Sequence, residues 1–402
     1  MSFKGFDEIA TSQYAQSIFR CQGCENTCDV TVVETGGRKM HYGDRCERFQ
    51  GERPKETSNP FDEREKILSK YLAAVKGRTT IGLPRAGMFY ELAPLWATFL
   101  SNLGFGIIPS QKTNKKVISS GLEKTTAEFC YPFKVAFGHF ADLDGKADFV
   151  FAPDVIQNYR SRYFGDGELK DTGWDRSRTC PYLQNFGPVV ARNTLHTKCI
   201  NPVLNLRGDR EKLFKELRKS FLRAGLNFSG REIEDAFFDG EIAYTRFKKL
   251  LRAEGKKVLD CIGDKSRGVV IIGRPYTAYD GEMNLKLAGK IAHYGFVPIP
   301  MDFLPFPDED LSRRWGNEFS IQGQMILNAA NVSRKLGLNA VFLDYFGCGP
   351  NSFIRSFFER ELGKPFLTLQ IDEHTADAGL VTRLEAFLDS IELRKDEGEA
   401  KK

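Results

Sequence analysis

Two parts of this 402-residue sequence carry the same series of landmarks, about 190 residues apart. The turn Gly82-Leu83-Pro84-Arg85 has a counterpart in Gly273-Arg274-Pro275-Tyr276, and the apolar strand that begins at Ala147 has one at Ala340. Around these landmarks short apolar strands alternate with amphipathic helices, which implies a mainly parallel sheet covered by helices. We therefore predict an α/β fold with two similar Rossmann-like halves, possible products of duplication. The alternative is that the landmarks are turn signals that all α/β units share.

Five segments can be distinguished along the chain. Residues 1–60 are polar and irregular and contain closely spaced cysteines, which predicts a small metal-binding module and a linker. Residues 61–205 and 265–392 are the two predicted Rossmann-like halves. Residues 206–264 have apolar side chains at helical spacing and are predicted to form a helical connector. The mixed-charge residues 393–402 are expected to be a disordered tail.

The composition excludes several classes of protein. Hydrophobic residues make up 41% of the chain and aromatic residues 12%, enough for a substantial core. The net charge of +5 is small for this length and gives no case for nucleic-acid binding. No apolar run reaches the roughly 18 residues of a membrane span, and the N-terminal residues show no secretory signal. We expect a cytoplasmic protein that binds neither nucleic acid nor membranes.

Nine cysteines are unusual for a protein of a reducing compartment, where metal binding is the usual alternative to disulfides. Cys21, Cys24 and Cys28 are closely spaced, and Cys46 follows. Four thiolates suit zinc or an iron–sulfur cluster, and the spacing does not choose between a structural zinc site and a cluster. His41 is a less favoured substitute ligand.

Two other cysteines lie in turns that lead into predicted helices. Cys130 precedes Tyr131-Pro132, and the proline fits the first turn of a helix. The helix N-terminus is therefore expected to lower the pKa of the Cys130 thiol. Cys348 is flanked by Gly347 and Gly349, which allow a bulky group such as an inorganic cluster to approach closely.

The remaining cysteines and two arginines complete the candidate residues. Cys180 is a third candidate ligand, on a loop, whereas Cys199 and Cys261 are interpreted as small buried apolar side chains. Arg85 and Arg274 follow the first strand of each half, where a guanidinium can hold a phosphate or a carboxylate. A salt bridge that closes the turn is the alternative role for both arginines.

Two histidines have different predicted roles. His374, in Asp372-Glu373-His374, follows a predicted strand and is a weak candidate for a general acid or base. A hydrogen-bonding loop at the end of the sheet is the alternative interpretation of that segment. His139 is predicted to be packed inside a helix.

Several of these segments, taken in order, resemble the C-terminal module of large CoA-substrate-specific enzyme activases. That module is related to the iron–sulfur subunits of 2-hydroxyacyl-CoA dehydratases and to double-cubane cluster reductases. The similarity extends from about residue 18 to residue 392. It is carried by Ile81-Gly82-Leu83-Pro84-Arg85, Glu128-Phe129-Cys130-Tyr131-Pro132, Gly273-Arg274-Pro275-Tyr276, Phe346-Gly347-Cys348-Gly349-Pro350 and Ile371-Asp372-Glu373-His374.

The resemblance implies a 4Fe–4S cluster held by three cysteines between the two halves, in an anaerobic metabolism. The positions that match are Cys130, Cys180 and Cys348, and the four N-terminal cysteines match a segment that precedes the module in large activases. Those four are expected to hold zinc or a second iron–sulfur cluster. The chain has no phosphate-binding motif of its own, so a separate ATP-dependent activase would have to deliver the electron.

Three functions are compatible with these observations. The first is a dehydratase-like lyase or an ATP-coupled low-potential reductase component, with an acyl-CoA as candidate substrate. The second is a non-catalytic electron-transfer or scaffold subunit that docks the activase and another cluster-bearing subunit. The third is a zinc-stapled α/β binding protein without a cluster.

Overall fold

The structure is a computed structural model in which the chain forms two compact units, Met1–Thr57 and Ser58–Lys402. The first unit contains a three-stranded antiparallel sheet in the order β1-β2-β3. The prediction of an irregular module is wrong for these strands, because β-branched residues concentrated in β2 favour extended backbone. Their bounds are Tyr14–Arg20, Asp29–Thr35 and Arg38–Tyr42. The residues described are 13–22, 27–44, 49, 59–72, 77–159, 162–165, 168–171, 174, 176–305, 309–373 and 378–399.

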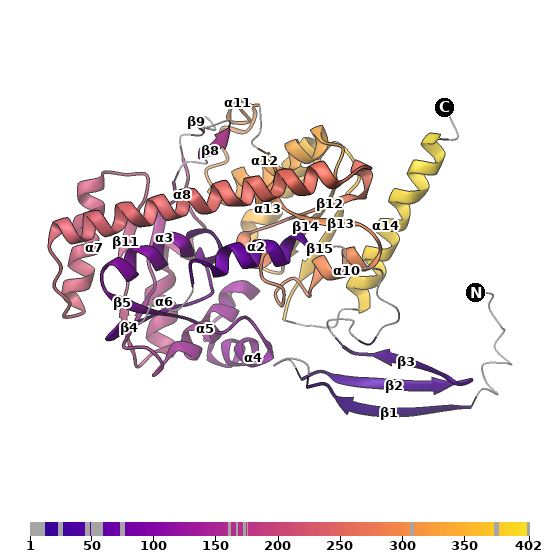
Figure 1. Cartoon of the computed structure of the whole chain (residues 1–402), viewed down its shortest axis with the longest axis horizontal. Helices are drawn as coiled ribbons and strands as arrows, with labels where there is room; N and C mark the ends of the chain where they lie inside the picture. Colours follow the sequence, from indigo (N-terminus) through magenta and orange to yellow (C-terminus); the bar gives the residue numbers. More distant parts are fainter. Residues whose placement is uncertain are drawn as a thin grey trace. The chain divides into compact units, whose positions relative to one another are not determined.

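The second unit is built on two four-stranded parallel sheets (Figure 1). The first has the order β10-β6-β4-β5 and the second the order β13-β12-β14-β15. Both therefore place their strands in the order second–first–third–fourth along the chain, as doubly wound folds do. The predicted parallel α/β architecture is confirmed, whereas an origin by duplication stays a prediction. The strands are β4 (Thr79–Leu83), β5 (Phe105–Pro109), β6 (Phe149–Phe151), β10 (Lys198–Ile200), β12 (Gly268–Ile272), β13 (Val297–Pro300), β14 (Asn339–Tyr345) and β15 (Leu367–Ile371).

A short segment around Arg178 is hydrogen-bonded to both halves of the second unit. Strands β6 and β10 continue as the parallel pair β7 (Asp154–Gln157) and β11 (Val203–Asn205). Arg178 forms an antiparallel bridge with Gln157 of β7 and a parallel bridge with Ser320 of the second half. The segment that follows the β8–β9 hairpin (Arg162–Gly165 and Glu168–Asp171) therefore joins the two halves.

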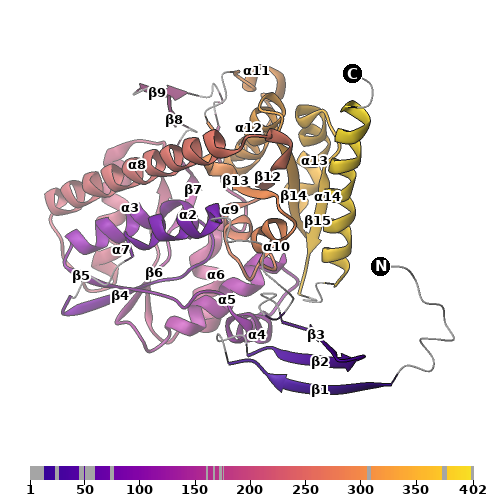
Figure 2. The same cartoon turned by 45° about the vertical axis from the view of Figure 1, so that its right-hand side comes forward.

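Helices cover the sheets and also connect the halves. Helix α3 (Phe89–Asn102) packs on β4 and β5, and α12 (Ile321–Lys335) packs on β12 and β14. The predicted connector contains α7 (Arg210–Arg223) and α8 (Gly230–Cys261), and α8 packs on both α3 and η3 (Met301–Phe303). Figures 1 and 2 show α8 running across both halves. The other helices are α2 (Pro60–Ser69), α4 (Lys115–Lys124), α5 (Tyr131–Leu143), α6 (Phe186–Thr194), α9 (Pro275–Ala278), α10 (Leu287–His293), α11 (Ser312–Trp315), α13 (Gly349–Leu362), α14 (Ala378–Glu399), η1 (Leu183–Asn185) and η2 (Lys265–Arg267).

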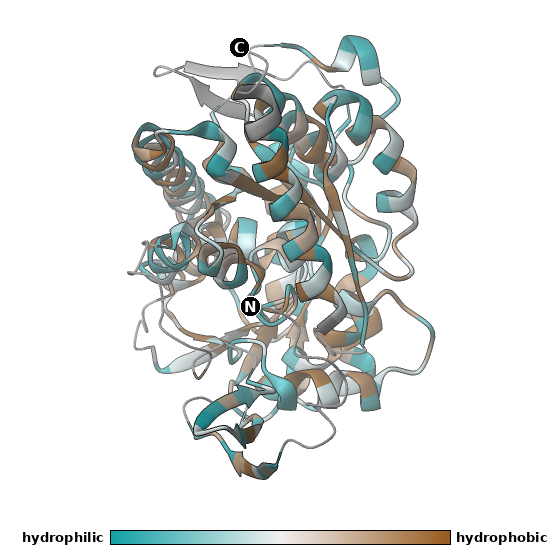
Figure 3. Cartoon of the chain, turned by 90° about the vertical axis from the view of Figure 1, so that its right-hand side faces the viewer, coloured by the Kyte–Doolittle hydropathy of each residue, from teal (hydrophilic) through white to brown (hydrophobic). Residues whose placement is uncertain are grey.

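The core lies between the sheets and these helices. Every residue of β12 and β14 is buried, and the strands of the second sheet are mostly brown in Figure 3. In the first half, Phe221 of α7 and Phe237 of α8 contact Phe99 of α3 with ring centroids 6.0 and 5.8 Å apart. These aromatic contacts fix the connector on the first sheet.

The C-terminal segment differs from the expectation of a disordered tail. Helix α14 continues to Glu399, and residues 400–402 lie outside the described part of the chain. Most of the mixed charges of this segment come from Arg, Lys and Glu, which are good helix formers, so the helix that begins at Ala378 can continue. No helix among the described residues is long and apolar enough to cross a membrane.

Candidate metal centre

Cys130 lies at the carboxyl side of the first sheet, at the N-cap of α5. Pro132 occupies the first turn of this helix, as the sequence predicts. The expectation of a lowered thiol pKa is wrong, because burial raises the pKa of Cys130 to about 12. The backbone N–H of Phe133 and the charge of Arg274 lower this pKa, and they offset only part of the effect of burial.

Cys348 lies in the turn between β14 and α13, directly against Cys130. Gly347 has a φ of +82°, and a Cβ there would lie 3.6 Å from the Cα of Cys130. The glycine therefore permits the left-handed backbone of a turn that packs in ordinary van der Waals contact with Cys130. The N-cap of α13 is Cys348 itself, without a capping bond from its side chain. Burial raises the pKa of this thiol, and Arg274 acts in the opposite direction.

Cys180 comes from the segment that is hydrogen-bonded to both halves. Two residues before it, the backbone N–H of Arg178 donates to Phe319 at 2.9 Å, while the N–H of Thr179 donates to Ile156 at 3.2 Å. Cys180 and Cys130 line the same cavity, which has about 270 Å³ of empty space, part of it open to solvent. The pKa of Cys130 is also raised by Cys180 and by Cys348, so the three thiols lie within electrostatic range of one another.

The three thiols, as the described part of the chain places them, do not form a site for a single metal ion. Within the described residues, no group of three or more His, Cys, Asp or Glu side chains is placed to hold one metal ion. The three cysteines predicted to act together thus meet in one region without forming a compact tetrahedral site.

Arg274 is the charged group of this region. The side chain is 1% exposed, and its Nε donates to Oδ1 of Asn351 at 2.9 Å. Its Nη1 is buried without a hydrogen-bond partner among the described residues. Cys348 and Cys180 both influence the pKa of Arg274, which places the guanidinium near the thiols. A buried cation with an unused donor is a site for an anionic group.

A protein-family model matches a large part of this chain. The family described as CoA enzyme activase uncharacterised domain (DUF2229) matches residues 80–304, more than half of the chain. The chain belongs to this family. The segment that matches the CoA enzyme activase domain includes Cys130, Cys180 and Arg274, whereas Cys348 follows it. No curated protein matches the chain.

Arg85, which also falls within the CoA enzyme activase domain, is engaged differently from Arg274. Its Nε donates to the backbone oxygen of Ser110 at 3.0 Å, and its Nη1 lies 3.5 Å from Oε1 of Glu65. These contacts close the turn after β4, which was the alternative role considered for this arginine.

Two tyrosines at the cysteine site received no role from the sequence. Tyr345 ends β14, and its hydroxyl donates to the hydroxyl of Tyr276 at 2.9 Å. Burial raises the pKa of both phenols well above the usual value, and the cysteine thiols raise it further. Tyr276 belongs to the motif Gly273-Arg274-Pro275-Tyr276, and Tyr345 lies three residues before Cys348. Only the fold shows that the two hydroxyls meet.

The segment that contains His374 approaches the same helix as Cys130. Lys134 of α5 forms ion pairs with Glu128 at 3.0 Å and with Glu373 at 3.3 Å. His374 itself lies outside the described residues. The predicted packing of His139 is confirmed, since it is buried and both ring nitrogens are hydrogen-bonded.

The N-terminal cysteines are described only in part. Cys21 and Cys28 are buried, and the N–H of Cys21 donates to the oxygen of Cys28 at 2.8 Å. Cys24 and Cys46 lie outside the described residues. The ring of His41 stacks on Phe49 with centroids 5.6 Å apart.

The two cysteines predicted to be apolar core residues have different surroundings. Cys199 of β10 is half-buried and packs against the core, as expected. Cys261 is exposed, so that prediction is wrong. It is the last residue of α8, where the helix leaves the surface that it covers.

Proposed function

We propose that this chain is an iron–sulfur protein of the 2-hydroxyacyl-CoA dehydratase/activase-related type. In this proposal Cys130, Cys180 and Cys348 hold a 4Fe–4S cluster between the two halves. A separate ATP-dependent activase delivers the electrons, and an acyl-CoA is the substrate class. Family membership supports the connection with CoA enzyme activases and leaves the cluster and the reaction as proposals.

The buried, unused Nη1 of Arg274 beside two of the three cysteines is the observation that carries the proposal. A buried guanidinium without a counter-charge is costly, and three thiolates that hold a cluster make an anionic group. Thiols on different irons of a cluster lie further apart than ligands of one ion. The absence of a single-ion site among the described residues is therefore compatible with a cluster.

The residues around the thiols have separate tasks in this proposal. Arg274 balances negative charge and lowers the pKa of the Cys130 and Cys348 thiols against the effect of burial. Gly347 supplies the left-handed backbone of the Cys348 turn, which packs against Cys130. The paired hydroxyls of Tyr276 and Tyr345 give the site a buried hydrogen-bonding wall. When bound, the cluster supplies one-electron reduction and Lewis acidity.

We also propose that the N-terminal unit binds zinc or a second iron–sulfur cluster through Cys21, Cys24, Cys28 and Cys46. The support is local, since Cys21 and Cys28 are buried next to each other through a backbone hydrogen bond. Four soft ligands suit either metal centre.

Iron and acid-labile sulfide counts on anaerobically purified full-length protein test the proposal. We expect iron and sulfide in cluster ratio and the visible absorbance of thiolate-bound iron. Cys348→Ala should lower both this absorbance and the iron count by the content of one cluster. Cys261→Ala is the matched control, because Cys261 is exposed and far from the thiol site in sequence, and its iron count should equal that of the unmodified protein.

Two results would overturn the cluster assignment. One is zinc as the sole metal in protein without absorbance, and the other is an iron count that Cys348→Ala leaves unchanged. Turnover of acyl-CoA substrates with an added activase and ATP then separates a catalyst from a non-catalytic electron-transfer or scaffold subunit.

A further inference from the structure

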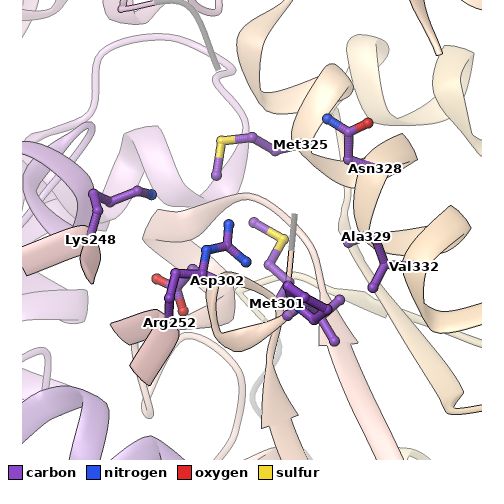
Figure 4. A pocket seen from close by; sticks show the side chains of 10 residues that line it. Lys248, Arg252, Met301, Asp302, Met325, Asn328, Ala329 and Val332 are labelled. Carbon is purple, nitrogen blue, oxygen red and sulfur yellow. The ribbon is translucent and has the colours of Figure 1, made fainter. Parts of the chain in front are cut away.

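A second polar cavity lies at the carboxyl end of β13, separate from the cysteines. It is formed by α8, by α12 and by the residues after β13, and it is named here the α8–α12 pocket (Figure 4). Ligands of parallel α/β sheets bind at this end of the strands. The pocket is lined by Lys248, Arg252, Met301, Asp302, Leu304, Pro305, Met325, Asn328, Ala329 and Val332.

Asn328 is a buried polar side chain with no partner in this pocket. It is 2% exposed, and neither Oδ1 nor Nδ2 has a hydrogen-bond partner among the described residues. Leaving both amide atoms buried and unsatisfied costs free energy, on the order of 1–3 kcal/mol for each group. A donor and an acceptor are therefore available to a molecule that enters the pocket.

The pocket is also lined by two basic side chains and one carboxylate. Lys248 and Arg252 lie one turn apart on α8 and both line it. The ammonium of Lys248 forms no ion pair with a described residue. Burial lowers its pKa, Asp302 and Glu91 raise it, and Arg252 and Arg64 lower it further. The carboxylate of Asp302 is already paired with Arg64, with Nη2 and Oδ2 2.9 Å apart. Figure 4 shows Lys248 and Asn328 coming from different walls of the pocket.

The size and the apolar walls restrict what can bind. The pocket encloses about 330 Å³ of empty space, part of it open to solvent, and its interior has room for about one or two water-sized molecules. Two methionines, Met301 and Met325, and the aliphatic side chains of α12 form the rest of the lining. Phosphate would need donors for more oxygens than these side chains supply, whereas a carboxylate needs fewer and brings an apolar chain.

We propose that the α8–α12 pocket binds the carboxylate group of a small organic acid. Lys248 neutralises the carboxylate and Nδ2 of Asn328 donates to it, while the hydrocarbon part of the acid extends along the methionines toward the part of the pocket that is open to solvent. The inference does not depend on a cluster at the cysteines, and it concerns a site that the proposed function does not use.

The test measures the unfolding temperature of the full-length protein in sodium acetate, sodium propionate, sodium phosphate or sodium chloride at constant ionic strength. A ligand that binds the folded state raises Tm saturably. We expect a saturable rise with acetate and a tighter one with propionate. Lys248→Met and Asn328→Leu should each weaken apparent binding by about ten- to a hundredfold, the worth of one hydrogen bond to a charged group.

Lys256→Met is the matched control, because it removes the same charge from an exposed position of the same helix. It should leave propionate binding unchanged. If a variant does not fold, binding can be followed on the unsubstituted protein by NMR. With ¹³C-methylated lysines, the Lys248 signal should move on addition of propionate and should not move with chloride.

Three results would overturn the proposal. They are a response to propionate no larger than that to chloride, binding of phosphate without binding of carboxylates, and propionate binding retained in both pocket variants.

Discussion

His139 is predicted to remain neutral in the folded protein well below the pH at which an exposed histidine is protonated. It lies inside a buried chain of hydrogen bonds (Figure 1 shows its helix, α5). Ser110 accepts from a backbone N–H and lies 3.0 Å from Nδ1, while Thr113 donates to Asp280 and lies 3.1 Å from Nε2. Since each hydroxyl donates once, Nδ1 accepts and Nε2–H donates. A second ring proton would leave Ser110 without an acceptor.

The size of the effect on stability follows from the pKa shift of His139. Burial and the charge of Arg85 lower the pKa of His139 from 6.5 to about 3. Between these values the unfolded chain binds the proton and the folded chain does not, so stability is full above pH 6.5 and falls as the pH decreases. At about 1.4 kcal/mol per pH unit, this group removes about 2 kcal/mol between pH 7 and pH 5, and about 4–5 kcal/mol by pH 3.

The assay is guanidinium-induced unfolding at several pH values between 7 and 5, for the protein and for His139→Gln. Buried carboxyls with raised pKa values, such as Glu91 and Asp154, have the opposite pH dependence, and they cancel in the difference between the two proteins. The stability gap should narrow by about 2 kcal/mol on acidification. His196→Gln, at a side chain that is 99% exposed, is the control.

A direct measurement is the ¹⁵N spectrum of the His139 ring, which should show a neutral ring with its proton on Nε2 throughout this range. A ring that titrates near pH 6.5, or a stability gap that does not change with pH, would refute the reasoning.

Three more perturbations have expected sizes. In Gly138→Ala the new methyl would lie 1.8 Å from a backbone oxygen of α4, so thermal unfolding should show a loss of about 1–3 kcal/mol of stability. The control is Gly289→Ala, whose methyl meets open space and should change stability little. Equal effects of the two substitutions would contradict this. Burial raises the pKa of Glu91 to about 7, so this group alone should remove about 3 kcal/mol of stability as the pH rises from 4.5 to 7. The difference in stability between the protein and Glu91→Gln should change by that amount in urea titrations. Arg64→Met leaves the carboxylate of Asp302 buried and unpaired, so the free energy of unfolding should fall by about 3–5 kcal/mol in denaturant titrations. A fall below about 1 kcal/mol would disprove a structural role for the pair.

Much of the fold was predictable because its signals are local. Apolar runs such as Gly268–Ile272 and Asn339–Tyr345 are strands in the structure, and glycines close the turns after them. The N-terminal strands were missed because their polar, exposed side chains hide the alternation on which strand prediction depends. The C-terminal helix was missed because its charges were interpreted as a solvated tail.

The site was predictable in its residues more than in its chemistry. Spacing and turn context indicated Cys130 and Cys348, and the fold brings their turns into contact. Burial sets the thiol pKa values, and a sequence does not state burial; the helix N-terminus therefore received too much weight. The same holds for Arg274, whose unused donor depends on which side chains surround it in the folded chain.

The backbone bonds at Arg178 and Thr179 couple the geometry of the thiols to the alignment of the two sheets. Any rotation of one half against the other would have to break the bonds to Phe319 and Ile321 on one side or the bond to Ile156 on the other. Cys180 follows directly, so it would keep its distance to only one of its two companions. A hinge at this point would change the distances between Cys180 and the other two cysteines. The hydrogen bonds at Arg178 and Thr179 oppose such a change.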